Sequence, residues 1–125
     1  MMQGRTLSNY FEGKKILITG ATSGIGRSLT YWYLNKGAKV ALVGNQDEQE
    51  LAKIAHEFPQ TALSLRGDLT HDSFLKKIKE EIINVFGGLD ILINCAGKSI
   101  IVVAFEVLSE LESLISSLLL CDNIE

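Results

Sequence analysis

Hydrophobic residues follow two patterns along the chain: short continuous runs, and stripes in which apolar positions recur every three or four residues. Runs rich in β-branched residues are typical of buried strands, and the wider spacing is typical of amphipathic helices. The runs predict strands at 14–19, 38–43, 61–66 and 89–94, and the stripes predict helices over 24–37, 46–58 and 71–86. Because strands and helices alternate, we expect the α/β class, with a doubly wound parallel sheet.

The stripes also predict which helical side chains are buried. They are Ile25, Leu29, Trp32 and Tyr33 in the first helix, Leu51, Ile54, Ala55 and Phe58 in the second, and Phe74, Leu75, Ile78, Ile82 and Val85 in the third. Past Gly97 the pattern weakens. Residues 100–104 fit a strand or a loop, and residues 109–121 fit a helix with an apolar face too broad for an ordinary surface helix.

Composition and charge exclude several classes of protein. The 125 residues are 46% hydrophobic and 22% charged, which indicates a globular domain, and the net charge of -3 offers no basic field for nucleic acid. The longest apolar runs fall far short of the roughly 20 residues of a membrane-spanning helix, so we expect no membrane partner. Cys95 and Cys121 occur without a secretory leader, which predicts free thiols and a cytoplasmic location. His56 and His71 lack partners at ligand spacing, and no metal site is predicted.

A glycine-rich turn joins the first predicted strand to the first predicted helix. Its sequence is Thr19-Gly20-Ala21-Thr22-Ser23-Gly24-Ile25-Gly26. Glycine lets the backbone turn sharply and approach a ligand closely, and the amides that begin a helix present donors and positive dipole to a pyrophosphate. A glycine triplet alone also fits a purely structural turn. Its place between a strand and a helix favours a phosphate site here.

Three landmarks, in order along the chain, make the sequence similar to the short-chain dehydrogenase/reductase family. They are the Gly-x-x-x-Gly-x-Gly spacing of the turn, the pair Asp68-Leu69 after the third strand, and Asn94-Cys95-Ala96-Gly97, which resembles the family's Asn-Asn-Ala-Gly signature. The resemblance covers residues 14–97. It implies a Rossmann fold, a bound NAD or NADP, and hydride exchange between this cofactor and an alcohol or carbonyl.

The same resemblance implies which residues bind the cofactor. The backbone around Gly20, Thr22, Ser23, Gly24, Ile25 and Gly26 would hold the pyrophosphate, Asp68 and Leu69 the adenine, and Asn94, Ala96 and Gly97 the floor beside the ribose and nicotinamide. Two structural alternatives stay open. Asp68 also fits a cap for the helix that begins near His71, and Asn94 also fits a residue that stabilises the central strand.

The end of the second predicted strand bears on the choice between NAD and NADP. NAD-preferring members carry an acidic residue there and NADP-preferring members a basic one nearby, whereas this chain has Gly44-Asn45-Gln46-Asp47. Gly44 leaves room for a phosphate, Asn45 can hydrogen-bond either form, and Asp47 lies late enough to be the N-terminal charge of the next helix. Because the NAD carboxylate is missing, we favour NADP over NAD, with Arg27 as a source of positive potential.

The family's catalytic serine and Tyr-x-x-x-Lys pair have no counterpart at the expected place. Tyr10 and Lys14 have the bare spacing but precede the first strand, and leucines occupy 118–120, where the family has a helical asparagine. We assign no catalytic residue and leave enzymatic activity open. We interpret the chain as the cofactor-binding half of a family member; a truncated gene, an alternative product and a drifted tail all fit the sequence.

We divide the chain into a lead-in over 1–13, a dinucleotide-binding half over 14–104, and an apolar C-terminal helix over 105–125. This division would leave the outer edge of the fourth strand and the C-terminal helix uncovered, so we predict self-association into a homo-oligomer. The alternative function is therefore a catalytically inactive interaction module that self-associates through these two surfaces.

Overall fold

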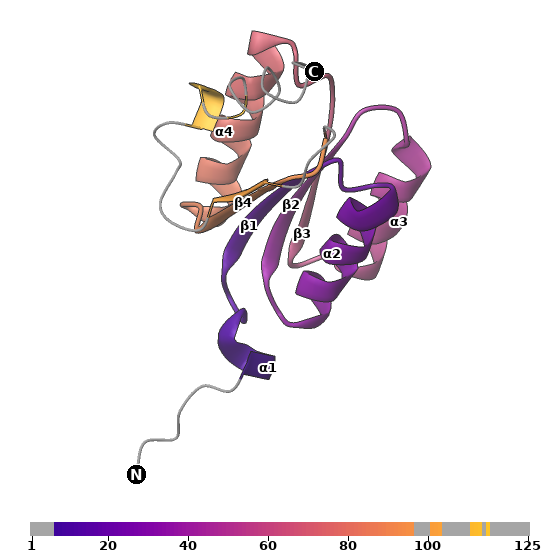
Figure 1. Ribbon diagram of the computed structural model, residues 1–125, viewed down its shortest axis with the longest axis vertical. Coiled ribbons are helices and arrows are strands. Elements are labelled where there is room, and N and C mark those ends of the chain that lie inside the picture. Colours follow the sequence, from indigo (N-terminus) through magenta and orange to yellow (C-terminus); the bar gives the residue numbers. More distant parts are fainter. Residues whose placement is uncertain (1–6, 97–100, 104–110, 114, 116–125) are drawn as a thin grey trace.

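The structure is a computed structural model that describes residues 7–96, 101–103, 111–113 and 115. Its described strands form one sheet in the order β3-β2-β1-β4-β5 (Figure 1). They are β1 Lys15–Thr19, β2 Lys39–Gly44, β3 Ala62–Arg66, β4 Ile91–Asn94 and β5 Ile101–Val103. The pairings among β1 to β4 are parallel, as predicted, and β5 is antiparallel to β4.

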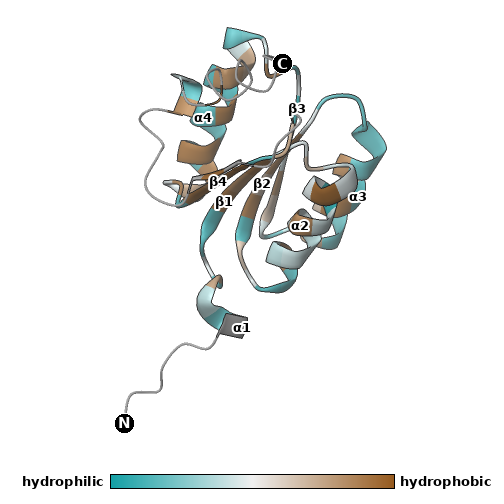
Figure 2. Ribbon diagram, in the orientation of Figure 1, coloured by the Kyte–Doolittle hydropathy of each residue, from teal (hydrophilic) through white to brown (hydrophobic). Residues whose placement is uncertain are grey.

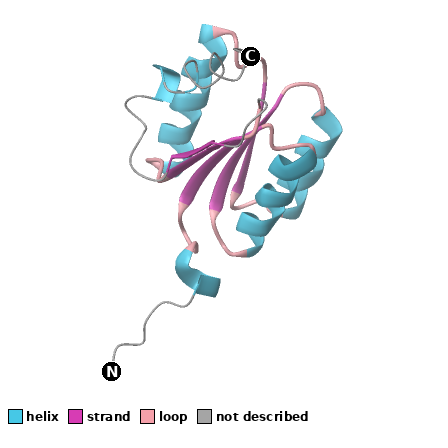
Figure 3. Ribbon diagram, viewed as in Figure 1, coloured by secondary structure: helices cyan, strands magenta, loops and turns pink. Residues whose placement is uncertain are grey.

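Helices cover both faces of this sheet (Figure 3). Helices α2 and α3, at Gly24–Asn35 and Glu48–Glu57, pack on one face, and α4, at Asp72–Phe86, packs on the other. A short helix α1, Leu7–Tyr10, precedes β1 within the segment predicted to be a lead-in. The predicted doubly wound α/β fold is confirmed.

Alternating side chains of the strands divide the core into two clusters, because successive residues of a strand point to opposite faces. Leu17, Ala41 and Leu92 face α4, and Ile16, Leu42 and Ile93 face α2 and α3. All of these residues are fully or almost fully buried, as expected for a parallel sheet covered on both faces. Figure 2 shows the resulting hydrophobic layer of strands between the helices.

Half of the predicted buried stripe of α2 is confirmed, because Leu29 and Tyr33 are partly buried against the core, and the other half is wrong. Ile25 is 59% exposed and Trp32 is 46% exposed, whereas the buried positions are Gly26, Thr30 and Leu34. These three are spaced four residues apart and form the line along which α2 approaches the sheet. Trp32 packs instead at the surface, with its ring centroid 5.6 Å from that of Phe11. Gly26 and Thr30, together with Leu34, therefore mark the inner face of α2.

The stripes of the other two helices are largely confirmed. Leu51 and Ile54 are buried in α3, as are the expected residues of α4 with one exception. Val85 is exposed, and the adjacent Phe86 is buried in its place. Gly87 caps the C-terminus of α4 directly after Phe86. It has a left-handed φ of 79°, and its amide donates to two carbonyls of the last turn.

The two surfaces expected to be uncovered are partly covered. The outer edge of β4 pairs with β5 along Leu92, Ile93 and Asn94, so the expectation of an open β4 edge is wrong. Leu111 and Ile115, the buried described residues of the predicted C-terminal helix, pack in the cluster beneath α4. An apolar helix covers apolar residues of its own chain first, because that burial costs no association entropy. Most of the predicted C-terminal helix lies outside the described residues, and self-association stays a prediction that has lost the open β4 edge as support.

Candidate cofactor-binding site

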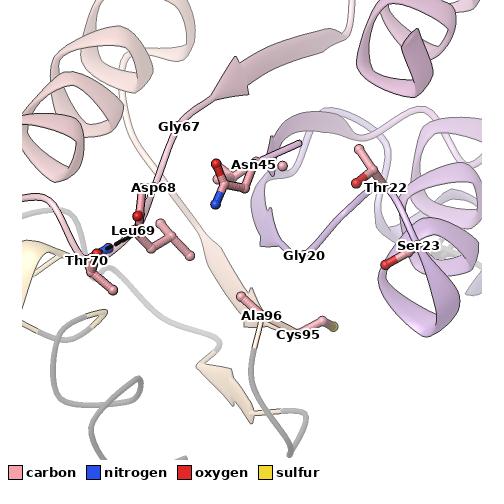
Figure 4. A pocket seen from close by; sticks show the side chains of 12 residues that line it. Gly20, Thr22, Ser23, Asn45, Gly67, Asp68, Leu69, Thr70, Cys95 and Ala96 are labelled. Atoms are coloured by element: carbon pink, nitrogen blue, oxygen red, sulfur yellow. Dashed lines mark hydrogen bonds between the residues drawn. The ribbon is translucent and has the colours of Figure 1, made fainter. Parts of the chain in front are cut away.

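A pocket of about 380 Å³ lies at the carboxyl ends of the parallel strands. The central strand β1 has β2 on one side and β4 on the other, so the strand order reverses direction at β1. Open α/β sheets bind ligands at such switch points. Figure 4 shows its residues, which are Gly20, Thr22, Ser23, Val43, Gly44, Asn45, Gly67, Asp68, Leu69, Thr70, Cys95 and Ala96.

Two glycines of the turn allow α2 to approach the sheet closely. Gly20 has a φ of 65°, and a Cβ at this position would lie 2.7 Å from the carbonyl oxygen of Cys95. A Cβ on Gly26 would overlap the carbonyl oxygen of Gly20. Neither position therefore admits a side chain without movement of the backbone. The glycine spacing read from the sequence is a steric requirement of this corner.

The N-terminus of α2 reaches the pocket without a side-chain cap. Ser23 is the N-cap residue, in extended conformation, and its side chain makes no capping hydrogen bond. The first amides of an α-helix have no partner within the helix. The turn itself is anchored by the amide of Ala21, which donates to the carbonyl of Val43 at 3.0 Å. Uncapped amide donors and the positive end of the helix dipole thus lie beside the pocket residues Thr22 and Ser23.

Asp68 lies on the opposite side of the pocket and is held by Thr70. Its carboxylate accepts hydrogen bonds from the Thr70 amide at 2.9 Å and from the Thr70 hydroxyl at 2.7 Å. These bonds lower the pKa of Asp68 below its usual value, with a smaller contribution from the nearby His71. The N-cap residue of α4 is His71, so the alternative of Asp68 as a helix cap is wrong. Asp68 is an ionised residue of the pocket wall.

Asn45 follows β2 directly, and its side chain lies between the glycine turn and the Asp68 segment (Figure 4). The preceding Gly44 leaves room for the side chain of Thr22, whose Cγ2 would be 2.9 Å from a Cβ there. Asp47 accepts a hydrogen bond from the Glu50 amide at 3.2 Å and thereby caps α3, as the sequence suggested. Its carboxylate is therefore used by its own helix.

Arg27 is paired away from the pocket. Its Nε donates to Oε2 of Glu50 at 2.9 Å, and this bond raises the pKa of Arg27 and lowers that of Glu50. The ion pair joins α2 to α3. Glu50 therefore offsets the positive potential expected of Arg27.

Asn94 is fully buried between the strands below the pocket. Its Oδ1 accepts a hydrogen bond from the Thr19 hydroxyl at 2.6 Å, and the Thr19 oxygen accepts one from the Cys95 amide at 3.2 Å. These bonds tie the end of β1 to the end of β4. Within the described part of the chain, the Asn94 Nδ2 has no partner, which is rare for a buried polar group. This geometry favours the strand-stabilising alternative for Asn94.

The structure gathers most of the predicted residues around one pocket. Seven of them line it: Gly20, Thr22, Ser23, Asn45, Asp68, Leu69 and Ala96. Gly24, Ile25 and Gly26 form the first turn of α2, and Gly97 lies outside the described residues. Gly67 and Thr70 also line the pocket and were not predicted. Their position directly after β3, at the same edge of the sheet as the glycine turn, is the signal that would have identified them.

Comparison with known proteins gives the family. Residues 14–116 match the short chain dehydrogenase family, and the chain belongs to it. Among curated relatives, the uncharacterized oxidoreductase YghA of Escherichia coli is 37% identical over 97 residues, which cover 74% of this chain and 33% of the relative. The NADPH-dependent aldehyde reductase 1 of Arabidopsis thaliana is 35% identical over 100 residues, which cover 73% of this chain and 35% of the relative. The chain thus spans about a third of the length of these relatives.

Solved structures give the same fold. The 3-ketoacyl-(acyl-carrier-protein) reductase of Brucella melitensis, in complex with NADH, superposes with a TM-score of 0.60 and 34% identity, over 66% of this chain and 34% of the reductase. The parts of the chain that the structure describes contain no helix long and apolar enough to cross a membrane. The same residues include no group of three or more potential metal ligands.

Proposed function

We propose that this chain binds a nicotinamide dinucleotide in the pocket at the carboxyl edge of its sheet. The uncapped N-terminus of α2 carries the proposal, because it brings amide donors to a corner where Gly20 and Gly26 leave no room for side chains. The pyrophosphate would bind at this corner. The adenine would lie beside Asp68 and Leu69, and its ribose beside Asn45, all of which line the same pocket.

The proposed activity of the whole protein is hydride exchange between this cofactor and an alcohol or carbonyl. The bound cofactor would supply or accept the hydride. The part of the chain over 14–104 would bind and orient it, with Ala96 and Gly97 on the nicotinamide side and Asn94 holding the strands below. The sequence after β4 contains no Tyr-x-x-x-Lys pair. We therefore assign these 125 residues cofactor binding and no proton transfer.

We propose NADP in preference to NAD. In NAD-specific sites a carboxylate after the second strand binds the ribose hydroxyls. Gly44-Asn45-Gln46 offers none, and the carboxylate of Asp47 caps α3. The Arabidopsis relative is named as NADPH-dependent, which agrees with this preference, whereas the Brucella reductase was solved with NADH.

A cytoplasmic location belongs to the same proposal. It rests on the thiol of Cys95, which forms no disulfide within the described residues and whose pKa is raised by partial burial, since thiols persist in reducing compartments. The net charge of -3 supports a small-molecule ligand over a nucleic acid.

Isothermal titration of the full chain with NADPH and NADH tests the proposal. We expect saturable binding of both, abolished in Gly20→Ala, because the added methyl would displace the Cys95 carbonyl and distort the turn. Ser28→Ala, at an exposed position on α2, is the matched control and should bind like the wild type. Absence of binding heat from a folded wild-type sample, with ligand in the millimolar range, would overturn the proposed function.

A further inference from the structure

Among the described residues that line the pocket, none is a cation that could bind the extra phosphate of NADP. Among the twelve residues that line it, Asp68 is the one that carries a charge, and this charge is negative. A ribose 2′-phosphate bound at the end of β2 needs a positive partner, usually an arginine nearby. Within the described part of the chain, such a partner would therefore reach the pocket from a neighbouring position.

Arg66 occupies such a position, at the end of β3. It pairs in register with Gly44, the last residue of β2. The preceding Leu65 packs in the cluster beneath α4, so Arg66 projects from the other face of the sheet, where α2 and α3 lie. Its Nε donates to the carbonyl oxygen of Asn45 at 3.2 Å. This bond holds the guanidinium group beside the residue that faces the ribose in the proposed function.

The charge of Arg66 is available to a ligand. Its side chain is 54% exposed, and its nearest acidic partner, Glu48, lies 3.8 Å away and is 75% exposed. Exposed pairs at this distance contribute little and exchange readily with a better anion. Arg27 differs, because its Nε is 2.9 Å from Glu50, whose side chain is only 16% exposed. The remaining donors of the Arg66 guanidinium suit a phosphate, which arginine binds through two parallel hydrogen bonds.

We infer that Arg66 is the specificity-determining residue for the phosphorylated ribose, and that it binds the 2′-phosphate of NADP while its Nε stays on the Asn45 carbonyl. The inference rests on the proposed function, since it requires the dinucleotide to occupy this pocket. It assigns the cation to the end of β3. The family pattern places this cation near the end of β2, at Gly44-Asn45-Gln46 in this chain, which is one strand closer to the glycine turn.

Binding titrations of the full chain with NADP⁺ and NAD⁺ test this assignment. Arg66→Gln keeps a long polar side chain and removes the charge, so it should weaken NADP⁺ binding about tenfold or more and change NAD⁺ binding by less than about twofold. Arg27→Gln is the matched control and should leave the ratio of the two affinities unchanged. Glu48→Gln should strengthen NADP⁺ binding modestly, because it removes the competing carboxylate. Circular dichroism establishes that each variant is folded.

The outcomes separate this inference from the proposed function. Suppose that the wild type binds both dinucleotides. If Arg66→Gln then weakens the binding of both equally, or leaves both affinities unchanged, the assignment of Arg66 is overturned and cofactor binding stands. If the wild type binds neither, the proposed function fails and the inference fails with it. A salt-dependent preference for 2′,5′-ADP over 5′-ADP, lost in Arg66→Gln, supports recognition of the 2′-phosphate itself.

Discussion

Helices α4 and α2 pack on opposite faces of one sheet, α4 through large side chains and α2 largely through small ones. The α4 face buries Phe74, Leu75, Ile78, Ile82 and Phe86. The α2 face buries Gly26, Thr30 and Leu34, and the Thr30 hydroxyl donates to the Gly26 carbonyl at 2.8 Å. Neither helix contributes a residue to the pocket lining, but the N-cap residue of α2, Ser23, does, so α2 must bring its N-terminus against β1. The comparison shows that a helix whose N-terminus adjoins the pocket is shaped by close approach to the sheet as well as by hydrophobic burial.

The largest expected effect comes from the α4 face. Ile78→Ala removes a fully buried side chain and leaves a cavity, so it should lower the free energy of unfolding by about 3 to 4 kcal/mol. Ile83→Ala, on the same helix but 45% exposed, should cost less than about 1 kcal/mol. Urea denaturation followed by circular dichroism measures both. Equal losses in the two variants would contradict the assignment of the inner face of α4.

A smaller loss of stability, with a larger loss of binding, is expected on the α2 face. Gly26→Ala forces a methyl group into the Gly20 carbonyl, so it should lower the free energy of unfolding by about 2 kcal/mol and abolish dinucleotide binding. The control is Ser28→Ala, at an exposed position of the same helix. It adds no buried volume, so its free energy of unfolding should stay within about 0.5 kcal/mol of the wild type. Denaturation and titration calorimetry on the same samples give both values. Normal binding by Gly26→Ala would show that close approach is not required.

The smallest effect concerns the polar contact between α2 and α3. Burial raises the pKa of Tyr31 to about 12, aided by a hydrogen bond that its hydroxyl donates to Glu57 at 3.0 Å. The folded state thus favours the neutral phenol, and its contribution is fully present below the ordinary pKa of 10.0 and is lost as the pH rises toward 12. Tyr31→Phe should therefore lose slightly less stability than the wild type between these pH values. Parallel losses in denaturation curves would contradict this coupling.

The contrast between the helices also explains what the sequence could predict. The stripe of α4 was read correctly apart from Val85, because hydrophobic burial alone determines its orientation. In α2 the same rule selected Ile25 and Trp32, which are exposed. The rule places large apolar residues on the inner face and takes no account of Gly26, which must lie against the backbone of the turn. The four parallel strands were found from short apolar runs, rich in β-branched residues in β1, β2 and β4. The antiparallel pairing of β5 was not, since a three-residue strand carries too little pattern.

The candidate site was predicted where a local motif carries the geometry. The glycine turn, Asp68 and Ala96 were found from short signatures, and the structure brings them to one pocket. Gly67 and Thr70 were missed although they flank Asp68 and Leu69, because the short signature contains that pair alone. Arg66 reaches Asn45 through the register of β3 beside β2, a relation between segments far apart in the chain. Sheet register is set by tertiary packing, so a single sequence leaves such neighbours unidentified.

The central claim is that the amides at the start of α2 bind the pyrophosphate of a nicotinamide dinucleotide. Amide chemical shifts recorded by proton–nitrogen NMR during titration of the full chain with NADP⁺ test it most directly. We expect the largest saturable changes at residues 22–26, with smaller ones at Asn45 and Asp68 and none along the aromatic surface at Phe11 and Trp32. Saturable binding that leaves residues 22–26 unchanged, or no change at any amide, would contradict the account.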